Sequence, residues 1–139
     1  MKKRNKKYKP KPATLPLTIR FDEDSERTLQ LLPHQELEQL REGKGEEKNW
    51  HTITCRLNIG LTLAYNIFTD CKQELDDALQ CMREIYARNE RIGKWILTGD
   101  ELRIVGQGLF LTDEMQLKST RRELNTAMDV VFIQAAIYK

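Results

Sequence analysis

Two histidines and three cysteines are the side chains best suited to nucleophilic or metal chemistry. Among them, His51 and Cys55 form the one local pair, four residues apart, a spacing that can place both on one face of a helix. A tetrahedral zinc site needs further ligands, and a catalytic thiol needs a histidine or a positive environment that lowers its pKa. Ordinary helix packing is the simpler interpretation, so we expect neither a metal nor a cofactor.

Other catalytic patterns are weak. The Gly-Gln-Gly sequence at 106–108 lacks the third glycine of a dinucleotide-binding loop, and no Gly-Lys-Ser or Gly-Lys-Thr occurs. Glu74, Asp76 and Asp77 are close in sequence, but spacing alone does not set two carboxyl groups at a catalytic distance. We therefore expect a protein that acts by binding and is not an enzyme.

The N-terminal region carries an unopposed positive charge. Eight of the 23 Lys and Arg precede Phe21, where no Asp or Glu occurs, so the other 15 face all 21 acidic residues. The first 21 residues therefore carry +8 and the remainder −6. Lys and Arg bind phosphates with release of counterions, and Tyr8 can stack on an unpaired base. The predicted nucleic-acid-binding residues are Lys2, Lys3, Arg4, Lys6, Lys7, Tyr8, Lys9 and Lys11.

Two further surfaces could bind partners. Lys118, Arg121 and Arg122 form a second basic group, either a secondary phosphate contact or a partner of the acidic body. Alternatively, the acidic helical surface makes the protein an interaction module, an inhibitor or adaptor of a host protein. Trp50 and Trp95 would anchor such an interface if an apolar patch is exposed, although packing in the core is the more ordinary role of Trp50.

Composition divides the chain into three parts. Residues 1–12 are too charged to bury apolar surface and are predicted to form a disordered basic arm. Residues 13–21 alternate apolar with smaller or polar side chains, which predicts an extended lead-in, and Pro16 excludes a central strand. Residues 22–139 have the periodicity of a single helical domain.

Helical periods continue through that domain. We expect two short helices: the polar cluster 22–25 opens the first, which runs to Leu32, and the second runs to Arg41 with Pro33 at its first position. The stretch 46–68 has the widest apolar stripe and should form the central helix. A further long helix should extend to Ile92, with Thr69 or Asp70 as its cap and Gly93 after its end.

The C-terminal third contains one ambiguous stretch. Residues 95–111 could form short strands joined by tight turns, but the capping-box order from Thr98 to Glu101 favours a third long helix. In that helix Gly106 and Gly108 would each cost about 1 kcal/mol. Small residues there could let another helix pack closely. The last helix should begin at Ser119 or Thr120, with Glu123 completing a second capping box.

Together these patterns predict an all-α bundle of three or four long helices plus short N-terminal helices, preceded by the arm. The basic N-terminus, Thr98-Gly99-Asp100-Glu101 and residues 113–116 (Asp-Glu-Met-Gln) together resemble uncharacterised small proteins of proteobacterial temperate phages and prophages. That resemblance implies an accessory role in the host cytoplasm. Since no secretory signal or membrane span is recognised, we expect a cytoplasmic protein that binds nucleic acid or a host protein and could form a homodimer.

Overall fold

The computed structural model describes the backbone of residues 23–137 and the side-chain surroundings of residues 31–134. The described residues form five α-helices, as the helical periods of the sequence predict. The predicted all-α bundle is therefore confirmed, whereas the predictions for residues 1–12 and 13–21 lie outside the described residues. The elements are α2 (Glu23–Arg41), α3 (Glu47–Asn66), the 3₁₀ turn η3 (Thr69–Cys71), α4 (Lys72–Ile92), α5 (Gly99–Lys118) and α6 (Arg121–Ile137).

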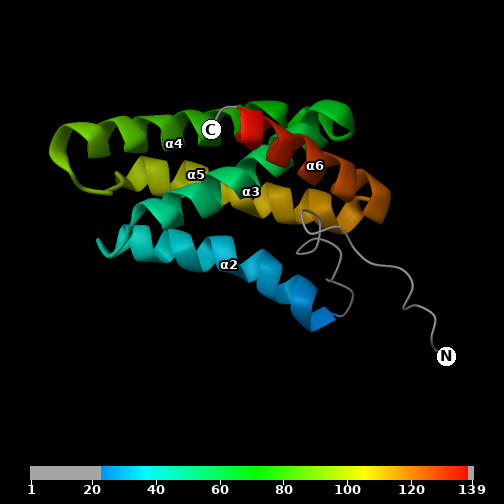
Figure 1. Ribbon diagram of the computed structural model, residues 1–139, viewed down its shortest axis with the longest axis horizontal. Coiled ribbons are helices and arrows are strands. Elements are labelled where there is room, and N and C mark those ends of the chain that lie inside the picture. The colour runs from blue at the N-terminus through cyan, green and yellow to red at the C-terminus, as the bar shows by residue number, and fades with distance from the viewer. Residues whose placement is uncertain (1–22, 138–139) are drawn as a thin grey trace.

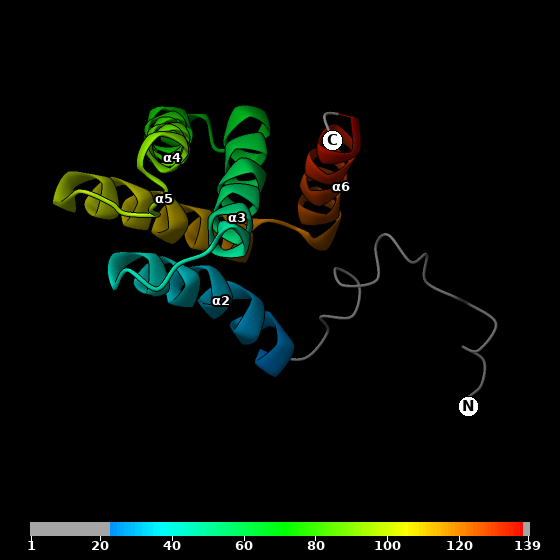
Figure 2. The same ribbon diagram turned by 60° about the vertical axis from the view of Figure 1, so that its left-hand side comes forward.

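The helices form two crossing layers around α3. Helices α4, α3 and α6 lie side by side in one layer, and α5 and α2 cross beneath them (Figures 1 and 2). Helix α3 packs against the other four, as its wide apolar stripe predicted, and Ile53 and Leu57 are completely buried. None of the described helices combines the length and apolar character needed to cross a membrane.

Helix α2 corrects the prediction of two short N-terminal helices. It is one continuous helix, and Pro33 lies in its interior rather than at a helix start. A proline inside a helix removes one backbone hydrogen bond and crowds the preceding turn. The part of the helix that follows the proline is held against the body, because Leu37 and Leu40 are buried and His34 contacts α5. Tertiary packing therefore outweighs the local cost.

The start of α4 also differs from the prediction. Neither Thr69 nor Asp70 caps this helix, since both belong to η3, and the N-cap residue Cys71 makes no side-chain capping hydrogen bond. The other end agrees with the sequence pattern. Gly93 adopts a left-handed conformation, with φ of 73°, and its backbone N–H donates to the Asn89 carbonyl.

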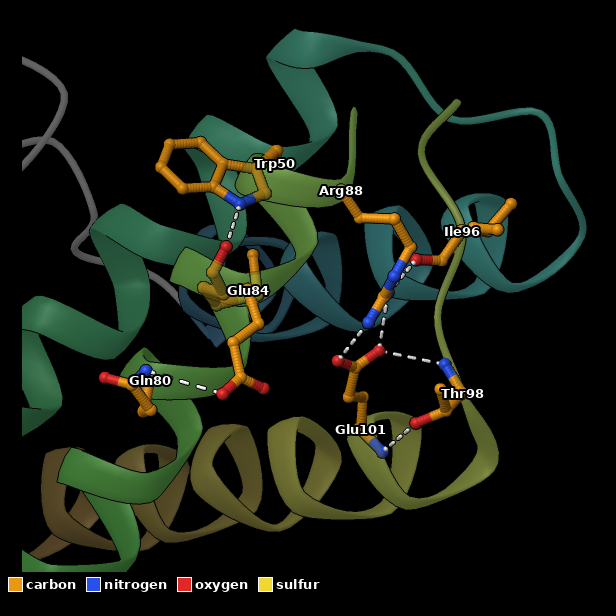
Figure 3. A network of polar contacts seen from close by, with 8 residues as sticks. Trp50, Gln80, Glu84, Arg88, Ile96, Thr98 and Glu101 are labelled. Atoms are coloured by element: carbon orange, nitrogen blue, oxygen red, sulfur yellow. Dashed lines mark hydrogen bonds and ion pairs between the residues drawn. The ribbon is translucent and has the colours of Figure 1, made fainter. Parts of the chain in front are cut away.

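A network of polar contacts closes the connection between α4 and α5. Arg88 reaches from α4 to both carboxylate oxygens of Glu101, at 2.8 and 2.9 Å, and also donates to the Ile96 carbonyl (Figure 3). Glu101 accepts from the Thr98 backbone N–H at 2.9 Å and donates its own N–H to Thr98 Oγ1 at 3.1 Å, so the predicted capping box is present. These bonds fix the start of α5 against α4.

The ambiguous stretch is resolved by α5, because residues 99–111 are helical and no strand occurs among the described residues. The two glycines of this helix differ. A Cβ at Gly108 would lie 2.7 Å from the Ala78 Cβ and 3.0 Å from Leu57 Cδ2, whereas one at Gly106 would meet only Leu37, at 3.9 Å. Gly108 alone of the two is therefore needed for close helix packing.

Candidate functional site

An apolar groove lies between α2 and α6, with α3 as its floor and α5 at one end. Its volume is about 380 Å³. Leu32 on α2 and Phe132 on α6 line it and remain 42% and 37% exposed, so the two walls do not close over it. The lining residues are Leu32, Pro33, His51, Thr52, Cys55, Arg56, Ile59, Gln116, Met128 and Phe132.

A buried charged group lies in this groove. Arg56 is only 6% exposed; its Nη2 donates to Gln116 Oε1 and lies 3.3 Å from Asp113 Oδ1. The other Asp113 oxygen lies 2.8 Å from His34 Nε2. Burial lowers the pKa of Arg56, and the adjacent Asp113 carboxylate opposes that change. Among the described residues, the Arg56 Nε has no hydrogen-bond partner, so the guanidinium retains unused donor capacity.

The groove also contains His51 and Cys55, the pair considered for metal or nucleophilic chemistry. His51 is exposed, and its Nε2 lies 3.2 Å from Glu47 Oε2. Burial raises the pKa of the Cys55 thiol, which keeps it in the poorly nucleophilic protonated form at neutral pH. Within the described residues, no three His, Cys, Asp or Glu side chains are grouped so that they could hold a metal ion.

The predicted second basic group lies at the turn between α5 and α6. Lys118 is the last residue of α5, Arg121 and Arg122 begin α6, and all three are exposed. Thr120 caps α6, since its Oγ1 accepts from the Glu123 N–H at 3.1 Å and its own N–H donates to Glu123 Oε1. This capping box fixes the turn. We call these three residues the basic corner.

The predicted acidic surface is less uniform than its sequence suggests. Glu74 and Asp77 are exposed on α4, whereas Asp76 is half-buried and accepts from the Tyr65 hydroxyl at 3.4 Å. Asp77 accepts from Gln73 Nε2 at 2.8 Å. Among the described residues, none of these carboxylates forms an ion pair with Lys, Arg or His within 4.0 Å. Their negative charge therefore faces solvent largely uncompensated.

The two tryptophans are half-buried, not fully enclosed. Trp50 and Trp95 pack against Tyr86, with ring centroids 5.0 and 5.8 Å away, and Trp50 Nε1 donates to the Met82 carbonyl at 2.8 Å. Both rings therefore pack against the core and leave only part of their surface for contact with another molecule.

Sequence patterns brought out the basic corner but missed the groove and its polar residues. His34, Arg56 and Asp113 come from three helices, and no spacing along the chain predicts that they meet. One signal was present: Arg56 lies between apolar residues of the central stripe, where a charge needs a buried partner. The arm residues lie outside the described residues. No protein-family model, curated protein or solved structure matches this chain.

Proposed function

We propose that this is a non-enzymatic accessory protein that associates with nucleic acid through its N-terminal cations, with the basic corner as a second contact. The observation that supports the proposal most directly is the division of charge, +8 over residues 1–21 against −6 over the rest. Because the acidic remainder repels phosphate at long range, binding must begin at the N-terminus. The resemblance to phage and prophage proteins is consistent with this role in the cytoplasm of a bacterial host.

The geometry of α2 supports cooperation between the arm and the basic corner. His34 contacts Asp113, and Leu37 lies nearest to Gly106, so α2 and α5 run antiparallel. The start of α2 and the turn after α5 consequently lie at the same end of the molecule in both views (Figures 1 and 2). The N-terminal residues join the body at this end. A polyanion held by the arm would therefore have the basic corner within reach.

Neutralising the arm tests its contribution. Replacing Lys2, Lys3, Arg4, Lys6, Lys7 and Lys9 with Gln in the full chain should weaken binding to a fluorescent duplex at least tenfold at low salt, because glutamine cannot neutralise a phosphate. Fluorescence anisotropy measures the affinity. Equal affinity of the variant and the wild type would refute an arm-driven association.

Neutralising the basic corner tests the second contact. The variant Lys118→Gln, Arg121→Gln, Arg122→Gln should reduce the magnitude of the log–log salt slope by about 1 for each phosphate that the corner no longer binds. A matched control is Lys44→Gln, Lys48→Gln, Lys94→Gln, which removes the same charge from exposed positions near the opposite end of the body. This control has the same reduced net charge as the corner variant but leaves the basic corner intact. Identical slopes in both variants would remove the corner from the interface.

The second candidate function is a protein-interaction module that uses the acidic face of α4. The observation in its favour is that Glu74 and Asp77 are exposed and form no ion pair with a described basic side chain. Such a face fits a basic partner surface. This function does not require the arm.

Charge reversal distinguishes the second candidate from the first. The variant Glu74→Lys, Asp77→Lys should lose a basic protein partner captured from a bacterial lysate. Its affinity for nucleic acid should not decrease, because the change removes negative charge that repels phosphate. Asp76 is left unchanged because its contact with Tyr65 contributes to packing. An unchanged set of captured proteins would exclude this face as the binding surface.

A further inference from the structure

The apolar groove between α2 and α6 is open although its surroundings are well packed. Leu32 and Phe132 line it, and the neighbouring Leu31 and Ile133 are 49% and 59% exposed. Its α3 floor includes the buried Arg56, whose Nε has no partner among the described residues. A segment with apolar side chains and free backbone carbonyls would match both properties, since a carbonyl can accept a hydrogen bond from a guanidinium.

We propose that residues 13–21 of the same chain occupy this groove. The segment, Ala-Thr-Leu-Pro-Leu-Thr-Ile-Arg-Phe, places Leu15, Leu17, Ile19 and Phe21 on one side of an extended chain. Pro16 lies on the other side and lacks a backbone N–H, so it requires no hydrogen-bond acceptor at that position. The inference concerns how the arm is joined to the body and does not depend on what the arm binds.

The length of the segment and its point of attachment support this occupant. Helix α2 begins at Glu23 and contributes the groove wall at Leu32, nine residues later, which corresponds to about 14 Å along a helix. An extended chain advances about 3.3 Å per residue. If the segment folds back along α2, it therefore needs about four residues, counted backwards from Glu23, to reach the position of Leu32. This position lies within the alternating run, next to Ile19.

Attachment to α2 also favours this segment over a separate molecule. A segment joined to the groove wall by a short connection has an effective concentration in the millimolar range, which a free partner seldom reaches. The seated segment would cover Cys55, which lines the groove and is part-exposed when the groove is open.

The accessibility of Cys55 in the full-length protein provides the test. The variant Leu17→Asp should unseat the segment and increase the rate of Cys55 alkylation by iodoacetamide about tenfold, as followed by peptide mass spectrometry. Thr18→Asp introduces the same charge on the opposite side of the segment and should change the rate less than twofold. A carboxylate near Cys55 would itself slow alkylation by disfavouring the thiolate, so the charge cannot produce the expected increase.

Three outcomes would overturn the proposal. If wild type, Leu17→Asp and Thr18→Asp give equal rates, the segment does not cover the groove. If protection of wild-type Cys55 decreases on dilution, the occupant is a second copy of the chain. The methyl signal of Met128 gives an independent readout, because it should shift in Leu17→Asp and not in Thr18→Asp; an unchanged signal in both variants would also contradict the assignment.

Discussion

At the scale of residues, the body depends on a small number of buried polar groups whose partners come from other helices. Arg56 on α3 contacts Asp113 on α5, and Arg88 on α4 contacts Glu101 on α5. The sequence predicted the local bonds of Glu101, because a capping box spans only four residues. It could not predict the long-range pairs, since they depend on how the helices cross.

Removing the Asp113 carboxylate should destabilise the protein. Asp113→Ala leaves the buried Arg56 charge without its carboxylate partner, and we expect a decrease of about 2–3 kcal/mol in the free energy of unfolding. The exposed Arg103–Asp100 pair provides a control, and Arg103→Ala should change stability by less than about 0.5 kcal/mol. Urea unfolding followed by circular dichroism measures both. Similar decreases in the two variants would contradict the structural role of the buried pair.

The Glu101 carboxylate should make stability dependent on pH. Hydrogen bonding from Arg88, with help from Thr98, lowers the pKa of Glu101 below its ordinary value of 4.5. A lowered folded-state pKa gives stability that is complete above the unfolded-state pKa and is lost as the pH falls through the folded-state value. Glu101→Gln should therefore cost about 1–2 kcal/mol at pH 7 and progressively less below pH 4.5.

Urea unfolding of wild type and Glu101→Gln between pH 3 and 7 measures this difference. A stability difference that is constant over that range would show that the charge of Glu101 makes no contribution.

At the scale of elements, the helices were largely predictable because their apolar periods are long and their ends carry capping signals. The exceptions have physical causes. Pro33 predicted a helix boundary, but α2 continues through it, and His34, Leu37 and Leu40 hold the following turns against the body. Thr69 and Asp70 have the residue types of helix caps but belong to a 3₁₀ turn before α4. In both places, the sequence leaves local alternatives nearly equal.

The two glycines of α5 should respond oppositely to the same substitution. Gly108→Ala would force a Cβ against Ala78 and Leu57, and we expect it to destabilise the fold by about 1–3 kcal/mol. Gly106→Ala meets ordinary contact distances and should stabilise α5 by up to about 1 kcal/mol through helix propensity. Thermal unfolding distinguishes the two. Equal effects would contradict the close crossing of α5 with α3 and α4 at Gly108.

At the scale of the whole molecule, the positive charge is concentrated in the N-terminal residues, whereas the apolar groove is formed by the helical body. The charge division can be read from the sequence, and it is the reason for proposing a polyanion contact at the N-terminus. The groove was not readable, because its walls come from helices that are distant in sequence. The crossing of α2 and α5 brings the start of the body and the basic corner to the same end of the molecule.

The most direct test of the proposed association is the salt dependence of binding by the full-length wild-type protein. Fluorescence anisotropy with a labelled DNA duplex, repeated from about 50 to 400 mM monovalent salt, gives the slope of log K against log salt concentration. If about six N-terminal cations contact phosphates, the slope should be near −5. A slope close to zero, or no binding at the lowest salt concentration, would contradict the account.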